Sequence, residues 1–104
     1  MKKDLNLFDD LNWMDAPNYP AGTMLKMMHD ANQIKTILLK VPCDFHMDAH
    51  LHDTVEQLYV LKGEFTIGNE TGTEGVCFNF QPQQLHGPFK SEQGGLVLIV
   101  RHPS

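Results

Sequence analysis

The sequence predicts an all-β fold, either an antiparallel sandwich or a barrel, with little or no helix. From Met24 onward, short apolar segments recur and are separated by Gly, Pro, Asn and Asp. No segment keeps a 3.6-residue apolar period over two or three turns, as an amphipathic helix would. A length of 104 residues with 41% hydrophobic residues is typical of one globular domain, spanning 1–104, with a single core.

The N-terminal residues 1–23 differ from the remainder of the chain because they show no clear period. The stretch "DAPNYPAG" contributes two prolines and a glycine. We expect an arm or a short edge strand that packs across the body of the domain, anchored by Phe8 and Trp13.

Strands are predicted over residues 23–29, 33–41, 55–62, 64–68, 76–80 and 94–102, where apolar and β-branched residues gather between turn residues. A tight turn at Lys62-Gly63 is expected to pair two of these strands, because glycine takes a positive φ at little cost. The predicted core consists of Ile37, Leu39, Leu58, Val60, Phe65, Ile67, Phe78, Phe80, Leu96, Leu98 and Val100.

Charge and cysteine content exclude several classes of protein. The formal net charge is -5 and the Lys and Arg residues are scattered, which argues against binding nucleic acid or an anionic membrane. Asp4, Asp9 and Asp10 interrupt the N-terminal stretch, so neither a signal peptide nor a spanning helix is expected. The two cysteines, Cys43 and Cys77, form no C-x-x-C pair. We therefore expect free, inertly buried thiols and a cytoplasmic location.

Histidine is the unusual residue, with 6 in the chain, and the stretch "HLHDTVE" holds two of them beside a glutamate. Side chains alternate faces along a strand, so His50, His52 and Glu56 share one face if the segment stays in register. The next residues on that face, Leu58 and Val60, belong to the predicted core. Two imidazoles and a carboxylate facing inward are costly unless a partner compensates for their desolvation, and a divalent cation is the simplest such partner.

A fourth ligand is expected from a different strand, because one strand cannot surround an ion. His86 in "FQPQQLHGPF" is the natural candidate, since it follows a turn and precedes Gly87-Pro88. Three imidazoles and one carboxylate suit Zn, Fe(II), Mn, Ni or Co, and the ligand types alone do not choose among these metals. No catalytic residue and no organic cofactor site can be named from the sequence.

The stretch "HLHDTVEQLYVLKG" resembles the first motif of the cupin superfamily, H-x-H-x3-E-x6-G, at His50, His52, Glu56 and Gly63. Pro82 and His86 loosely match the second motif, P-x-G-x-x-H. The flanks "LNWMDAPNYPAGTMLKMMHD" and "HGPFKSEQGGLVLIV" are similar to those of small single-domain, RmlC-like cupins such as the ChrR-type anti-sigma factor cupin domain and related dioxygenases. The resemblance implies a jelly-roll barrel, a double-stranded β-helix, in which those four ligands hold one metal ion.

The sequence departs from these motifs in three places. Asp44 stands where a glycine is expected before the first motif, the glycine of the second motif is missing, and Pro82 lies one residue closer to His86 than usual. We therefore expect a turn of different local shape before His86.

Two functions of different class follow from the resemblance. The first is a metal-dependent enzyme, similar to dioxygenases, isomerases or lyases, that acts on a small carbonyl-bearing molecule inside the barrel. The alternative is a non-catalytic sensory or regulatory module like the ChrR cupin domain. Because the chain begins close to the predicted barrel, such a module would need its protein partner supplied in trans. A homodimer is expected in either case, because pairing covers exposed strand edges.

Two further residues receive predictions. His46 shares the parity of His50, so it either lines the mouth of the barrel as a proton-transfer group or is a solvated histidine at the start of a strand. Tyr59 has the parity opposite to that of the ligands, so we expect it to pack outside the cavity together with Gln57.

Overall fold

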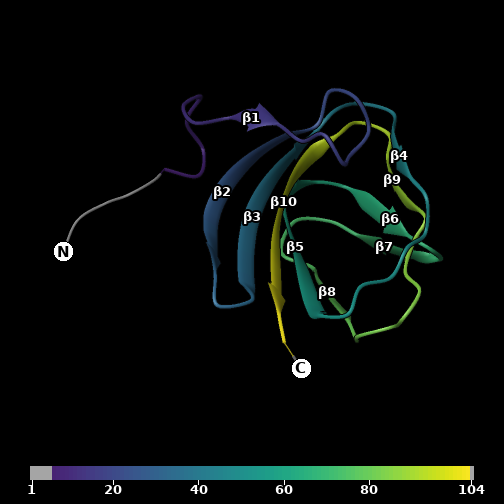
Figure 1. The fold of residues 1–104 in the computed structure, drawn as a ribbon. Helices are drawn as coiled ribbons and strands as arrows, with labels where there is room; N and C mark the ends of the chain where they lie inside the picture. Colours follow the sequence, from purple (N-terminus) through teal and green to yellow (C-terminus); the bar gives the residue numbers. More distant parts are fainter. Residues whose placement is uncertain (1–5, 104) are drawn as a thin grey trace.

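The fold consists of two antiparallel sheets that face each other, as a computed structural model of residues 6–103 shows (Figure 1). One sheet has the order β1-β2-β3-β10-β5-β8, and the other has the order β4-β9-β6-β7. No described residue is helical, so the all-β prediction is confirmed. Residues 1–5 of the predicted arm and residue 104 lie outside the described part of the chain. The strands are β1 (Met14–Asp15), β2 (Met24–Ala31), β3 (Ile34–Val41), β4 (Phe45–Met47), β5 (Val55–Gly63), β6 (Phe65–Ile67), β7 (Glu70–Gly72), β8 (Cys77–Phe80), β9 (Phe89–Ser91) and β10 (Gly95–His102).

The six predicted strands correspond to β2, β3, β5, β6, β8 and β10. The sequence did not indicate β4, β7 and β9, which together form most of the smaller sheet. Each of these strands has three residues, which is too short to display an alternating pattern. They are specified by their ladder partners rather than by their own sequence.

The tight turn predicted at Lys62-Gly63 is wrong. Strand β5 pairs with β10 and β8, whereas β6 pairs with β7 and β9, so the two strands belong to different sheets. Gly63 is instead the corner at which the chain passes between them. Its φ is +90°, and a Cβ there would lie 2.4 Å from the carbonyl oxygen of Gly94, which leaves room for glycine alone.

The core lies between the two sheets, and one strand contributes the face opposite to that predicted. Val97 and Ile99 of β10 are buried in the core, whereas Leu98 and Val100 are only partly buried and lie on the outer face. The segment "GLVLIV" is apolar throughout, so its period could not choose a face. Phe78 is half-buried against the core rather than within it. Ile37, Leu39, Leu58, Val60, Phe65, Ile67 and Phe80 are buried in the core as expected, whereas Leu96 is buried outside the core cluster.

The N-terminal segment covers the outer face of the larger sheet. Lys26 of β2 is fully buried there, and its Nζ donates to the backbone oxygens of Asn6 and Asp9 and to Asp9 Oδ1. Trp13 is half-buried, and the ammonium groups of Lys26 and Lys40 lie over its ring in cation–π contacts. Phe8 remains 62% exposed, beneath the Lys62 ammonium. This covering explains how both faces of the larger sheet contain buried residues.

Both cysteines are exposed, which corrects the expectation of inert burial. Cys43 lies in the loop before β4 and contacts the carbonyl oxygen of Gln93, and Cys77 opens the edge strand β8. A residue in a loop or on an edge strand has one side open to solvent, and the hydrophobic character of a thiol does not predict such a position. Among the described residues there is no helix with the length and hydropathy needed to cross a membrane.

Candidate metal site

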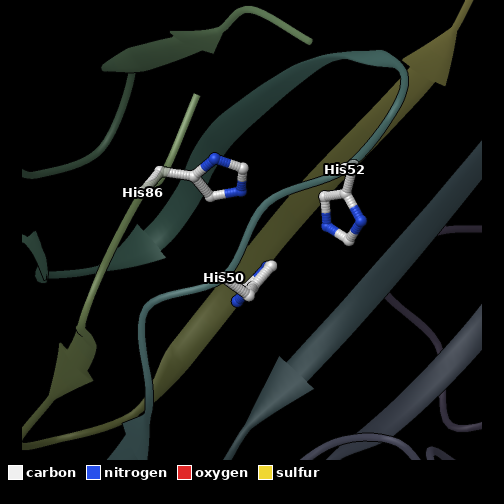
Figure 2. A group of neighbouring side chains, drawn as sticks. All are labelled: His50, His52 and His86. Carbon is white, nitrogen blue, oxygen red and sulfur yellow. The ribbon is translucent and has the colours of Figure 1, made fainter. Parts of the chain in front are cut away.

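Three histidines meet at one end of the space between the sheets (Figure 2). His50 and His86 form an isolated antiparallel bridge, in which each backbone N–H donates to the carbonyl oxygen of the other residue, at 3.0 and 2.9 Å. The carbonyl of His52 accepts a hydrogen bond from the backbone N–H of Gln83 at 2.8 Å, which ties the loop before β5 to the loop after β8. These backbone contacts bring together side chains from two stretches that are distant in the sequence.

The three imidazoles are close enough to share one ion. Their candidate ligand atoms lie within 4.8 Å of one another, and the ring centroids of His50 are 4.8 Å from those of both His52 and His86. His86 is buried and stacks on Phe80 with a centroid distance of 4.2 Å. Phe89 stacks on His50 at 5.2 Å. The two phenylalanines therefore fix the planes of two of the three rings.

The nitrogens of these rings are arranged as in a metal site. The Nε2 atoms of His52 and His86 are buried and have no hydrogen-bond partner. The Nδ1 atoms of His50 and His86 lie 3.1 and 2.9 Å from the carbonyl oxygens of Asp48 and Gln84. A backbone carbonyl at Nδ1 fixes the tautomer in which Nε2 keeps its lone pair, as the second shell of metal sites commonly does. Unpartnered buried nitrogens are costly, and a cation would satisfy them.

Glu56 lies beside the histidines and is almost completely buried, with 2% exposure. Its Oε2 is 3.6 Å from His86 Nε2, and its Oε1 is 3.7 Å from His52 Nε2. Oε1 also accepts a short hydrogen bond of 2.6 Å from Nε of Arg101. The arginine therefore orients the carboxylate, while Oε2 remains directed toward the histidine cluster.

The residues present fit a divalent cation. Two ligand atoms that are each about 2.1 Å from one ion can be at most about 4.2 Å apart. The contact of Glu56 Oε1 with His52 and that of Oε2 with His86 satisfy this limit. The group whose candidate ligand atoms all lie within 4.8 Å of one another consists of the three histidines, without Glu56. The widest imidazole separation, within 4.8 Å, needs only a small rotation of a side chain. Three histidines in a metal-like arrangement thus support a divalent metal, and the donor set leaves its identity open.

Two hollows adjoin the cluster. An interior cavity of about 30 Å³ lies below it and has mostly apolar walls, including Leu39, Leu58 and Val97. That space is enough for one or two water molecules. A larger pocket of about 320 Å³ forms the mouth and is lined by His50, His52 and residues of the N-terminal segment. Four residues line both hollows and mark the boundary between them: Tyr19, Met47, His50 and Arg101.

Burial sets the charge state of two of the imidazoles. Desolvation lowers the pKa of His52, the charge of Arg101 lowers it further, and the Glu56 carboxylate opposes both effects. Desolvation also lowers the pKa of His86, again against the attraction of Glu56. Burial acts to lower the pKa of Arg101, but Tyr19 and Glu56 together raise it above its ordinary value. At neutral pH, His52 and His86 are thus neutral imidazoles, the form that binds metal, beside the charged guanidinium of Arg101.

These shifts predict how the stability of the metal-free protein depends on pH. An unfolded histidine titrates near pH 6.5. Because the folded-state pKa values of His52 and His86 are lower, the unfolded chain binds more protons as the pH falls below that value. We expect the free energy of unfolding, measured by urea titration in EDTA, to be fully present above pH 7 and to decrease toward pH 5. A His52→Asn variant should lose part of this dependence, and His29→Asn, at an exposed histidine, should keep all of it. Equal pH dependence in the two variants would contradict the prediction.

The remaining residues considered in the sequence lie outside the site. His46 of β4 is exposed and lies 3.4 Å from Asp48, so it is the solvated histidine and does not line the mouth. Tyr59 lies on the outer face of β5 with 37% exposure, and Gln57 shares that face, as expected from parity.

Two polar residues beside the cluster were not predicted from the sequence. Arg101 was overlooked because the wrong face of β10 was assigned inward, although Arg101 has the same parity as Val97 and Ile99. Its ladder partner in β5 is Glu56 itself. Tyr19, whose hydroxyl lies 3.3 Å from Nη2 of Arg101, comes from the irregular N-terminal segment, where no period indicates which side chains point inward.

Comparison with known proteins agrees with this architecture. Residues 2–104 match the family model described as the ChrR Cupin-like domain. No curated protein sequence matches the chain. An acetylacetone dioxygenase from Acinetobacter johnsonii is similar in structure with a TM-score of 0.81 at 13% identity, covering 98% of this chain and 75% of that one.

Two further solved structures are similar over most of this chain. An RmlC-like cupin from Shewanella frigidimarina has a TM-score of 0.73 at 16% identity, covering 90% of this chain and 96% of that one. The structure of Rhodobacter sphaeroides SigE in complex with the anti-sigma ChrR gives a TM-score of 0.73 at 16% identity, covering 90% of this chain and 51% of the matched chain. At these identities the likeness shows the fold, which is the predicted jelly roll.

Proposed function

Because this chain belongs to the ChrR cupin-like family, we propose that it binds one divalent metal ion and uses it to act on a small carbonyl-bearing molecule. The ligands would be His50, His52, His86 and Glu56. The observation that carries the proposal is the pair of buried, unpartnered Nε2 atoms on His52 and His86, which face the Glu56 carboxylate beside an open pocket. A purely structural cluster of this kind would leave two buried acceptors unsatisfied.

In this proposal, some residues of the chain would hold the ion and others would bind the substrate. A bound divalent ion would polarise a carbonyl or enolate oxygen and, as Fe(II), could activate O₂. The backbone carbonyls of Asp48 and Gln84 keep two imidazoles in the required tautomer. Arg101 holds the Glu56 carboxylate in place by its short hydrogen bond. The substrate would enter through the 320 Å³ pocket, and apolar walls below the site would limit access of water.

The test is metal content followed by turnover. Protein purified without added metal is examined by elemental analysis and is then loaded anaerobically with Fe(II), Mn(II), Ni(II) or Zn(II). We expect one ion per chain and consumption of at least one member of a panel of β-dicarbonyls and hydroxyketones, followed by oxygen electrode and by NMR. The activity should disappear in His52→Ala and persist in His46→Ala, which alters an exposed histidine outside the site. A fully loaded protein that turns over no member of the panel with any of the four metals would refute the catalytic proposal.

The second candidate is a sensory module, which the match to the ChrR family favours. Such a module would hold a metal tightly without chemistry and would exert its effect through a protein partner. Metal identity discriminates between the two candidates, because tightly held zinc with four protein ligands and no bound water favours a sensor. Iron or manganese with exchangeable water favours catalysis. The homodimer and the cytoplasmic location expected from the sequence remain predictions, and light scattering would test the first.

A further inference from the structure

Charged residues on three adjacent strands lie in register at the mouth of the barrel. Arg101 of β10 pairs with Lys35 of β3 on one side and with Glu56 of β5 on the other. One step deeper on the same face, the three strands carry apolar residues at the equivalent positions: Ile37, Ile99 and Leu58. The polar row therefore separates the apolar interior from the open pocket, and two of its three members are cations.

The two cations keep hydrogen-bonding capacity that no described residue uses. Arg101 donates from Nε to Glu56 and from Nη2 to the Tyr19 hydroxyl, which leaves other N–H groups of its guanidinium available. Lys35 is half-buried and forms no ion pair with any described residue. Asp30 is its ladder partner in β2, yet the two side chains make no salt bridge. The Lys35 ammonium and the free N–H groups of Arg101 can therefore donate charge-assisted hydrogen bonds to an anion.

The composition of the pocket points the same way. Lys35 and Arg101 line the 320 Å³ mouth pocket together with His50 and His52, and no Asp or Glu lines it. The chain as a whole has a formal net charge of -5, so a pocket that lacks acidic residues and holds two cations departs from the average surface. Asp30 and Asp53 line an adjacent pocket on the other side of Lys35 and Arg101. Lys35 and Arg101 are thus the charged side chains that line the pocket beside the histidines, and Arg101 is also paired with Glu56.

We propose that Arg101 and Lys35 bind the carboxylate of the small molecule that enters this pocket, so that the preferred ligand is an oxo-carboxylate rather than a neutral ketone or diketone. The position of the carbonyl near the metal rests on the proposed function, whereas the recognition of the carboxylate rests on the two cations alone. The planar guanidinium matches a carboxylate by two parallel hydrogen bonds, and the lysine adds a mobile point charge.

The test compares two probes that differ in charge but hardly in shape. Freshly prepared acetoacetate carries a carboxylate where acetoacetamide carries a neutral amide. We expect calorimetric titration of the metal-free protein to give an affinity about tenfold higher for acetoacetate, because charge-assisted hydrogen bonds replace neutral ones. Lys35→Met should weaken acetoacetate binding about three- to fivefold and leave acetoacetamide binding unchanged. Arg101→Lys, which keeps the charge and loses the fork, should weaken acetoacetate binding further.

Lys90→Met is the matched control, because it removes the same charge from an exposed position on β9 in the other sheet and should leave both affinities unaltered. Equal affinity for the two probes, no detectable binding of either, or equal effects of the two lysine variants would overturn the inference. Repeating the titrations on zinc-loaded protein separates the two proposals. If the protein binds one metal per chain but binds acetoacetate and acetoacetamide equally, the carboxylate site is refuted and the metal site is retained. If the preference for acetoacetate depends on Lys35 but the protein binds no metal, the metal site is refuted and the carboxylate site is retained.

Discussion

Replacing His52 or His86 with alanine is expected to lower the affinity for a divalent metal by about 100-fold or more and to leave substoichiometric metal after dialysis. Even loss of an outer-shell partner commonly costs about 10- to 100-fold in metal affinity, so loss of a ligand should cost at least as much. Both side chains present a buried, unpartnered Nε2 to the same space. The measurement is elemental analysis of protein dialysed against a competing chelator, supported by competition titration with zinc.

The two variants differ in their structural side effects, and this difference sharpens the test. His86 stacks on Phe80 and is 5% exposed, so its removal also opens a cavity in the core. The side chain of His52 is 28% exposed and can be truncated with less loss of packing. His46→Ala, which alters an exposed histidine in β4, should retain one metal per chain. If His52→Ala folds as wild type and keeps its full metal content, the proposed ligand set is wrong.

The ligand cluster could be predicted from the sequence because most of its information is local. His50 and His52 are two residues apart, and Glu56 is the second residue of the strand predicted over residues 55–62. Spacing and parity therefore predict that these three side chains lie together. The turn before His86 departs from the usual motif, so the position of His86 was harder to predict. The backbone bridge with His50 brings it to the cluster. Coordination of one ion by these four residues remains a prediction.

The long-range partners of the site could not be predicted, for a physical reason. Arg101 lies 45 residues from Glu56 in the sequence, and their contact depends on the register between β10 and β5. The apolar run in β10 has one face buried in the core and an outer face that is partly buried, so hydrophobicity alone did not indicate which face points toward the core. The hairpin predicted at Gly63 was wrong because a glycine with positive φ suits both a hairpin turn and a passage between two sheets.

Replacing Arg101 with methionine is expected to destabilise the metal-free protein by about 3–5 kcal/mol, the range seen when one partner of a buried ion pair is removed. The Glu56 carboxylate, with 2% exposure, would then lack its strongest hydrogen-bond donor. A bound cation would supply the missing counter-charge, so zinc should raise the stability of the variant by more than it raises that of the wild type. Urea unfolding with EDTA and with excess zinc measures both effects.

The double variant Glu56→Gln/Arg101→Met identifies the cause of the loss. If the cost arises from an unpaired buried carboxylate, removing its charge as well should recover part of the stability in EDTA, and the two substitutions will be non-additive. The double variant should also lose the additional stabilisation by zinc, because the carboxylate that would receive the cation is gone. Additive losses with an unchanged zinc effect would mean that Arg101 contributes only packing and that Glu56 does not face the ion. The Glu56–Arg101 pair thus links the stability of the empty barrel to the proposed metal site, since the same carboxylate must be balanced by arginine or by metal.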